Sequence, residues 1–461
     1  MHKKLFVATA VAVVAGLALS GCSPSGDSSG DDDALTIWTV EDVAERITAQ
    51  QAIVDAYSEE SGVSVKLVAL GENDLATVLA SSAAAGEMPD AVGAASLPAI
   101  NQMASDGVLD SDAALTVITD LGVETFSPRA LELTQADGKQ LAVPSDGWAQ
   151  LLYYRTDLFE AAGLEAPTSF ESIRTAADAL NGEGMAGIVA STTPADAFTQ
   201  QTFEHFALAN DCQLVDDAGN ITLDSPQCQN ALGFYADLIT ENSTAGNQDA
   251  DTTRATYFAG QAAMVVWSSF LLDELAGLRN DALPTCAECA SDPGFLAANT
   301  GVVSAIEGPD GSEPASFGEI VSWGILEGAS AKTQDFIKYV MTEGYTDWLA
   351  ISPEGKVPTR YGTPDEPTKY IDAWAALEAG VDTKALLSDI YSPEILVAVA
   401  AAPDGFNRWG IPQGQGALAG AVSGQFVIPQ VLSEMINSGL SPTDAAKKAR
   451  EMAETIKSDL G

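Results

Sequence analysis

Apolar runs and helix-like stretches alternate from Leu35 onward, and this alternation constrains the fold more than any other feature of the chain. The runs Leu35–Val40, Val63–Leu70 and Pro89–Gly93 have the composition of strands. Between them, Arg46–Glu60 and Leu75–Ala85 carry apolar or small residues at helical spacing. Strand and helix in strict alternation are typical of a parallel sheet with helices on its faces. The sequence therefore predicts an α/β fold.

A second α/β unit is expected further along the chain. Ser169–Leu180 is predicted to be a helix, Gly187–Ala190 and Ala262–Trp267 to be strands, and Glu319–Ile325 to be a later strand. The last hundred residues are mostly helical and end with a helix over Pro442–Asp459. More than 400 residues in this pattern exceed one ordinary domain and suffice for two sizeable cores.

Ligands of open α/β sheets bind beyond the carboxyl ends of the strands. In the first half of the chain those ends fall at Thr39–Asp42, Gly71–Asp74 and Gly93–Ser96. We therefore expect binding residues near these three segments.

The N-terminal residues predict export. A basic start, Lys3-Lys4, precedes an apolar run from Leu5 to Leu19 that is too short to span a bilayer comfortably. The sequence Leu19-Ser20-Gly21-Cys22 then resembles a bacterial lipobox, which implies cleavage before Cys22 and acylation of its thiol. We expect residues 1–21 to be a lipoprotein signal peptide and the protein to be extracytoplasmic, held at the cell membrane only by the lipid on Cys22.

Residues 22–34 are rich in Ser, Gly and Asp and have no large apolar side chain, so they are predicted to be a flexible linker. The whole chain carries 65 acidic and 21 basic residues, a formal net charge of -44. This balance argues against nucleic acid as a partner, because nucleic-acid binding requires a basic surface. It also argues against electrostatic adsorption to anionic lipid. Solubility explains the charge more simply than a specific function does.

Four further cysteines occur as two local pairs. Cys212 and Cys228 flank a hairpin-like stretch, and Cys286 and Cys289 form Cys-Ala-Glu-Cys within a loop that contains proline. Outside the cytoplasm these spacings favour two disulfides, 212–228 and 286–289. A four-thiolate zinc site and a redox-active Cys-x-x-Cys pair are the alternatives; the loop setting of the second pair disfavours the redox interpretation.

Several motifs in the same order resemble the extracellular solute-binding proteins of ABC importers, in the maltose-binding-like sugar group. They begin with the strand Leu35–Trp38 and the Gly-x-x-Pro-Asp segment Gly86–Val92. Gly138–Pro144 matches a Gly-Lys-x-x-x-x-Pro crossover, and Phe258–Met264 matches Phe-x-x-Gly-x-x-Ala-Met. Departures include Arg155 where Asn is common.

The resemblance implies a two-lobed, type II periplasmic-binding-protein fold, in which each lobe is a sheet flanked by helices and the lobes are joined by a hinge. We expect the N-terminal lobe to comprise residues 35–144 and 319–355, and the C-terminal lobe residues 145–318 and 356–461. The hinge crossings are expected near Pro144–Trp148, Gly311–Glu319 and Ser352–Arg360. The resemblance also implies a monomer that closes on its ligand and then delivers it to transmembrane permease subunits.

Aromatic side chains are the strongest candidate ligand contacts, because sugars stack their apolar faces on flat rings while their hydroxyls bind polar side chains. Trp148, Trp267 and Phe270 follow predicted strand ends or crossings, and the resemblance places ligand-contacting residues at these positions. Each tryptophan has a plain alternative as a core residue. The full set of candidates is Trp148, Trp267, Phe270, Glu41, Asp42, Asp146, Trp409 and Trp323, with Phe198 and Gln201 as weaker ones.

Catalysis finds little support in the residues. After removal of His2 with the signal peptide, His205 is the one histidine, and neither His-Glu-x-x-His nor Gly-x-Ser-x-Gly occurs. We expect no enzyme activity, cofactor or metal, and a neutral oligosaccharide as ligand. The alternatives are a polyol phosphate or peptide, for which Arg155 or Arg408 would supply the cation, and less plausibly an exported hydrolase.

Overall fold

The structure is a computed structural model that describes residues 34–41, 43–71 and 74–460. The predicted signal peptide, Cys22, the linker up to Asp33 and the candidate Asp42 lie outside the described residues. Residues 34–461 form one unit of the chain, and all the described elements belong to it.

One nine-stranded mixed sheet organises this unit. β1 (Leu35–Thr39) lies parallel to both β2 (Val65–Ala69) and β3 (Ala91–Ala95), as the strand–helix alternation predicts. β9 (Ser316–Ile325) pairs antiparallel with β3, and β6 (Val143–Arg155) pairs antiparallel with β9. The remaining strands of the sheet are β7 (Met264–Ser268) and β8 (Thr300–Val303) on β6, β10 (Val357–Pro358) on β6, and β13 (Phe406–Asn407) on β9. Two short hairpins are formed by β4 (Gln135–Ala136) with β5 (Lys139–Gln140) and by β11 (Glu378–Ala379) with β12 (Ala385–Leu386).

Helices surround this sheet. Those before β6 are α1 (Ala44–Ser61), α2 (Leu75–Ala85), α3 (Leu97–Ser105), α4 (Ser111–Leu121) and α5 (Pro128–Leu133). Those between β6 and β9 are α6 (Thr156–Ala162), α7 (Phe170–Leu180), α8 (Ala197–Ala209), α9 (Pro226–Asn242), α10 (Ala250–Phe258), α11 (Leu271–Leu275) and α12 (Phe295–Ala298). After β9 come α13 (Ala331–Val340), α14 (Tyr345–Ala350), α15 (Lys369–Ala375), α16 (Leu387–Ile390), α17 (Pro393–Ala400), α18 (Ala402–Gly405), α19 (Gly416–Gly424), α20 (Val427–Ser438) and α21 (Pro442–Leu460).

Local sequence signals set several helix ends. α1 stops at Gly62, whose φ of 71° suits the left-handed conformation that glycine adopts without strain. α7 begins with a capping box, in which the side chains of Ser169 and Ser172 each accept the other residue's backbone N–H. Both ends agree with the helices expected from the sequence.

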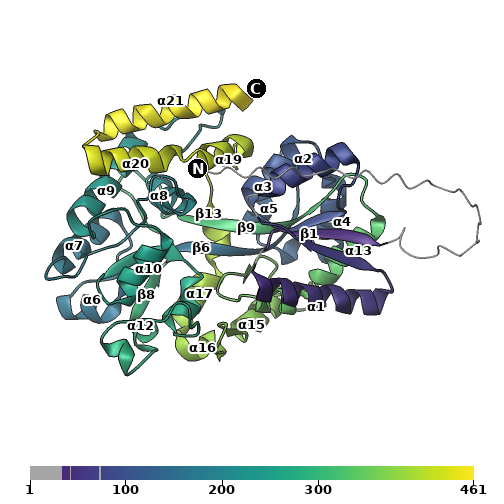
Figure 1. Cartoon of the computed structure of the whole chain (residues 1–461), viewed down its shortest axis with the longest axis horizontal. Helices are drawn as coiled ribbons and strands as arrows, with labels where there is room; N and C mark the ends of the chain where they lie inside the picture. The colour runs from purple at the N-terminus through teal and green to yellow at the C-terminus, as the bar shows by residue number, and fades with distance from the viewer. Residues whose placement is uncertain (1–33, 42, 72–73, 461) are drawn as a thin grey trace, which may run out of the picture. The chain divides into compact units, whose positions relative to one another are not determined.

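β6 and β9 are the longest strands, and they run through the middle of the unit (Figure 1). Three chain segments meet on them, because β10 places Val357 opposite Gly147 while β9 places Glu319 opposite Trp148. Close packing requires glycine at this junction: a methyl group at Gly318 would overlap the ring of Phe406. The three segments are those in which the sequence predicts hinge crossings.

The buried apolar side chains form separate clusters. One contains Trp38, Val92 and Leu326 and draws only on residues 38–142 and 326. Another contains Leu152 and Trp409 and draws only on residues 152–317 and 409–456. A third and larger cluster takes residues from throughout the unit. The chain thus builds two cores confined to separate parts of the sequence and a third that draws on both.

Most predicted elements match the structure, with one exception. Gly187–Ala190 is expected to be a strand, yet it forms only isolated bridges, including Val189 to Val265. Its neighbour α7 presses closely on it, since a methyl group at Gly187 would overlap the backbone of Ala177. The backbone N–H of Ile188 bonds instead to the carbonyl of Asn242, so the pairing with β7 is interrupted.

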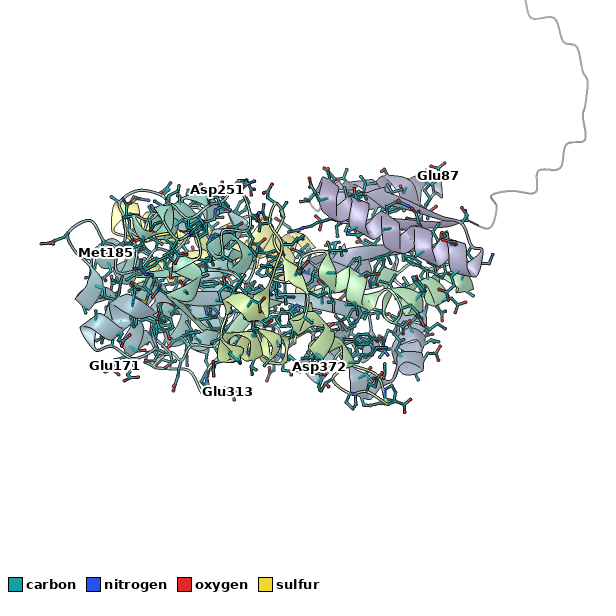
Figure 2. All side chains as sticks on the ribbon, turned by 90° about the horizontal axis from the view of Figure 1, so that it is seen from below. Glu87, Glu171, Met185, Asp251, Glu313 and Asp372 are labelled. Carbon is teal, nitrogen blue, oxygen red and sulfur yellow. A yellow bond between two sulfur atoms is a disulfide. The ribbon has the colours of Figure 1, made fainter. Side chains whose placement is uncertain are left out.

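Acidic side chains project from the surface of the unit, as Figure 2 shows for Glu87, Glu171, Asp251, Glu313 and Asp372. Their exposure agrees with an acidic composition that serves solvation. Among the described residues, none of the helices has both the length and the hydropathy that a membrane span requires.

Candidate functional site

An aromatic ring and a carboxylate share one face of the β6–β9 pair. Trp148 lies directly opposite Glu319, and directly opposed residues of antiparallel strands point to the same face. The Trp148 ring is half-buried, and its centroid is 6.0 Å from that of Phe317. Trp148 therefore retains exposed ring surface at the point where the chain segments cross.

Arg408 lies between two buried carboxylates beside this face. Its Nη1 donates to Glu319 and its Nε is 3.6 Å from Oε1 of Glu204, while its guanidinium is 4.6 Å from the ring centroid of Phe317. Burial alone would lower the pKa of Arg408, but the two carboxylates raise it overall. Burial also raises the pKa of Glu204, against the opposing charge of Arg408. The cation is thus committed to protein partners.

Glu319 also reaches the start of α3. Its Oε1 accepts the backbone N–H of Leu97 at 2.7 Å, and its other oxygen accepts Arg408. Sequence patterns do not identify Glu319 or Glu204, because a single Glu in a strand or helix carries no motif. They identify Arg408 only as a possible anion-binding residue.

A second cluster follows the carboxyl end of β1. Arg46 of α1 lies 3.4 Å from Glu41 and donates to Oγ of Ser352 at 3.3 Å. Its guanidinium is also 5.2 Å from the centroid of the Phe270 ring. The same ring contacts Gly355, at which any methyl group would overlap Phe270. The structure thus brings Glu41 and Phe270 together through Arg46, which no sequence pattern singles out.

Trp267 offers less surface than expected. Its side chain is buried, its Nε1 donates to the carbonyl of Ala250 at 3.0 Å, and its ring lies 5.6 Å from that of Phe198. Phe198 is half-buried, and Gln201 is half-buried on the same helix, α8. Trp267 thus packs behind Phe198, and Phe198 is the more exposed ring of this pair.

The structure does not support Asp146 as a ligand-binding residue. Its carboxylate is fully buried, accepts Trp348 Nε1 at 2.6 Å and lies 3.4 Å from Nζ of Lys356. A carboxylate with these partners has no free oxygen to offer a sugar hydroxyl. Asp146 instead joins β6 to the segment that enters β10.

The structure also does not support Trp323 and Trp409 as ligand-binding residues, because both are only 2 % exposed. Trp323 packs in the core with its ring 5.1 Å from that of Trp348. Trp409 donates from Nε1 to the carbonyl of Cys212 at 2.7 Å. Neither ring presents a face to a ligand, and the alternative interpretation as core residues holds for both.

Two buried carboxyl groups lie near Phe270. Asp273 is close to it in the sequence, and Glu354 precedes Gly355, which contacts the Phe270 ring. Asp273 and Glu354 are 1 % and 3 % exposed, and within the described residues Oδ1 of Asp273 and Oε2 of Glu354 have no hydrogen-bond partner. Burial raises the pKa of Asp273 to about 8, and the neighbouring Glu354 and Glu274 carboxylates add to the increase. Asp273 is therefore protonated at neutral pH.

His205 is a packed residue. It is fully buried, and its Nδ1 accepts the backbone N–H of Phe317 at 3.2 Å. Burial lowers its pKa to about 4, so the ring is neutral at physiological pH. Among the described residues no group of three His, Cys, Asp or Glu side chains could hold a metal ion.

The structure contains disulfides between Cys212 and Cys228 and between Cys286 and Cys289. These are the pairs that the local spacing favours. All four cysteines are buried, which agrees with a structural role.

Comparison with known proteins identifies the chain. The family model described as bacterial extracellular solute-binding protein matches residues 43–280, more than half of the sequence. This chain belongs to that family. Solute-binding proteins of this family are not enzymes, in agreement with the sequence analysis.

One curated relative extends the match over most of the solute-binding protein. The Escherichia coli (strain K12) protein YcjN, named as a putative ABC transporter periplasmic-binding protein, is 26% identical over 373 residues, which are 79% of this chain and 81% of the relative. The family description makes this chain an extracellular solute-binding protein. The relative's name assigns that relative to an ABC transporter.

Solved structures show the same fold. A solute-binding protein from Agrobacterium radiobacter K84 in complex with ribitol has a TM-score of 0.67 at 18% identity, over 92% of this chain and 99% of that one. The GacH receptor of Streptomyces glaucescens GLA.O, solved unliganded and with acarbose, has a TM-score of 0.67 at 19% identity, over 92% and 98%. Maltose-bound T. maritima MalE3 has a TM-score of 0.66 at 18% identity, over 92% and 99%. The predicted solute-binding α/β fold, like that of MalE, is confirmed.

Proposed function

We propose that this solute-binding protein captures a neutral carbohydrate, an oligosaccharide, between two lobes and delivers it to the permease of an ABC importer. We further propose that a lipid on Cys22 holds it at the outer face of the cell membrane. The partly exposed Trp148 side chain on the central strand β6 is the observation that carries the ligand assignment.

The proposed lobes are residues 35–144 with 319–355 and residues 145–318 with 356–461. Two of the three hydrophobic clusters support these boundaries, since each lies wholly within one proposed lobe. The pairing of β10 and β9 with β6 supports a hinge made of three adjacent segments. Adjacent crossings allow the lobes to move as bodies about one line.

The charges near Trp148 and Phe270 favour a neutral ligand. Arg408 is paired with Glu319 and Glu204, Arg46 with Glu41, and Lys356 with Asp146. Arg155, the other proposed anion partner, is paired with Asp157 at 2.6 Å. An anionic solute would have to take a cation from its carboxylate, whereas a neutral sugar needs ring faces and hydrogen bonds.

The structural neighbours support the same class of ligand. Complexes among them contain maltose, acarbose and cycloalternan, and two others contain the polyols ribitol and D-mannitol. A further neighbour is named as a cyclic alpha-maltosyl-1,6-maltose binding protein. A neutral polyol is therefore the second candidate, and it would use the same paired charges.

A comparison of neutral ligands with phosphorylated ligands tests this proposal. The purified protein is titrated calorimetrically with maltose, maltotriose, ribitol and mannitol, and with glucose 6-phosphate and ribitol 5-phosphate. We expect saturable binding of a neutral sugar or polyol and none of the phosphates. Preferential binding of a phosphate would overturn the assignment of a neutral ligand.

A further inference from the structure

A helix contact joins the two separate cores of the unit. α3 buries Ile100 and Met103 in the cluster of the proposed N-terminal lobe, and α19 buries Leu418 and Val422 in the cluster of the proposed C-terminal lobe. The two helices nevertheless touch one another, and Figure 1 shows α19 beside α3. We call this the α3–α19 contact. Because each helix is fixed in its own core, the contact reports the position of one core against the other.

Gly416 allows this approach. A methyl group at position 416 would overlap Cβ, Cγ and Oδ1 of Asn101 on α3. Asn101 is buried, and its Nδ2 donates to the carbonyl of Leu97 at 2.8 Å, so its side chain is not free to turn aside. Gly416 has no positive φ, so its backbone places no demand for glycine. The close neighbour alone excludes a side chain there.

Gly420, one helical turn further along α19, provides a natural comparison. A methyl group there would lie 3.6 Å from Cβ of Pro98, an ordinary van der Waals distance. The same helix therefore presents two glycines to α3, and only Gly416 is sterically restricted. Alanine is more favourable than glycine inside a helix, which applies to Gly420, whereas Gly416 is the first residue of α19.

A buried polar bridge supports the same arrangement. Glu319 accepts the backbone N–H of Leu97, at the start of α3, and pairs with Arg408, which precedes α19 in the chain. One oxygen of the Glu319 carboxylate thus binds the start of α3, and the other binds the segment before α19. Such an arrangement is satisfied only while α3 and the segment before α19 stay close, because separation leaves buried charges unpaired.

We propose that Gly416 and Asn101 are positioning residues for solute capture, whose close packing sets the closed arrangement of the two lobes. This inference rests on the proposed function, since closure matters only in a protein that captures its ligand between lobes. The ligand binds tightest to the closed arrangement, so the apparent affinity scales with the fraction of molecules that can reach it. A side chain at position 416 lowers that fraction without touching the ligand.

The test compares Gly416→Ala with Gly420→Ala. Sugar affinity is measured by calorimetry, dissociation by stopped flow, and the radius of gyration by small-angle X-ray scattering at saturating sugar. We expect Gly416→Ala to weaken binding at least about tenfold, to speed dissociation and to enlarge the radius of gyration. Gly420→Ala should stay within about twofold of the unmodified protein in affinity. Gly420→Ala should keep the thermal stability of the parent or exceed it, and circular dichroism should show that Gly416→Ala is folded.

A second substitution separates the contact from a general effect on α19. Asn101→Gly removes all three overlapping atoms, so the double variant Asn101→Gly/Gly416→Ala should recover most of the affinity that Gly416→Ala loses. Unchanged affinity and radius of gyration in Gly416→Ala, or an equal loss in Gly420→Ala, would overturn the proposal. If the parent binds no sugar, the proposed function fails. The radii of gyration of the parent and the two variants, measured without sugar, then show whether a side chain at position 416 still moves the two cores apart.

Discussion

Trp148 on β6 lies directly opposite Glu319 on β9, so an aromatic ring and a carboxylate from distant parts of the chain share one face of the central strand pair. The carboxylate is committed to Arg408 and to the backbone of Leu97. The ring is the member of the pair that remains partly exposed. This division agrees with the proposal that Trp148 stacks on the ligand while Glu319 holds the segments around it.

Replacing Trp148 by Ala should weaken sugar binding about 10- to 100-fold, because it removes a ring–sugar contact and the apolar area that the sugar covers. Phe234→Ala is the matched control, since Phe234 is also half-buried but stacks on Phe170 of α7. We expect the control to bind sugar normally. Equal losses in both variants, measured by calorimetry, would argue against a ligand contact at Trp148.

Replacing Arg408 by Met should destabilise the protein by about 3–5 kcal/mol, because two buried carboxylates lose their partner. Arg174→Met removes the more exposed pair with Glu241 and should cost less than about 1 kcal/mol. Urea denaturation measures both. A double variant Arg408→Met/Glu319→Gln should recover part of the loss, and its failure to do so would contradict the ion-pair account.

Asp273→Asn should stabilise the protein by an amount that depends on pH. The pKa of Asp273 is about 8 in the folded protein and near 3.8 when unfolded, so between these values the folded state holds the extra proton. Stability is therefore lost as the pH rises from about 4 to about 8, by at most ~1.4 kcal/mol per unit. The Asn variant escapes this loss, so its advantage should grow up to pH 8 and then level off.

Thermal unfolding at pH 5, 6, 7, 8 and 9 measures that advantage. Asp281→Asn is the control, because its exposed carboxylate has a pKa lowered by Arg279 and does not titrate in this range. A constant difference between Asp273→Asn and the parent across the series would show that Asp273 is already ionised at neutral pH.

Cys22→Ser should release the protein from the membrane, because the lipid is proposed to be its only anchor. Fractionation of expressing cells, with labelled palmitate as tracer, should show loss of label and a shift to the soluble fraction. The double variant Cys286→Ser/Cys289→Ser should keep both label and membrane association. Retention of Cys22→Ser in the membrane would contradict anchoring through this residue.

The fold could be predicted because it depends on local patterns. Strands such as Leu35–Thr39 and the capped helix α7 are encoded by neighbouring residues, and the motifs around Gly86 and Gly138 add the family's order of elements. The packed status of Trp323 and Trp409 could not be predicted, because it depends on which distant side chains surround each ring. The prediction for Asp146 was wrong for the same reason: Lys356 and Trp348, its partners, are remote in sequence.

The most direct test of the account is a calorimetric titration of the purified protein, stripped of bound solute, with neutral mono- and oligosaccharides, followed by chromatography of the recovered sugar. We predict saturable binding of at least one neutral sugar, recovered intact, and a greatly weakened response in Trp148→Ala. Absence of binding across the panel, or recovery of cleaved sugar, would contradict the proposal of a carbohydrate-capturing transport protein.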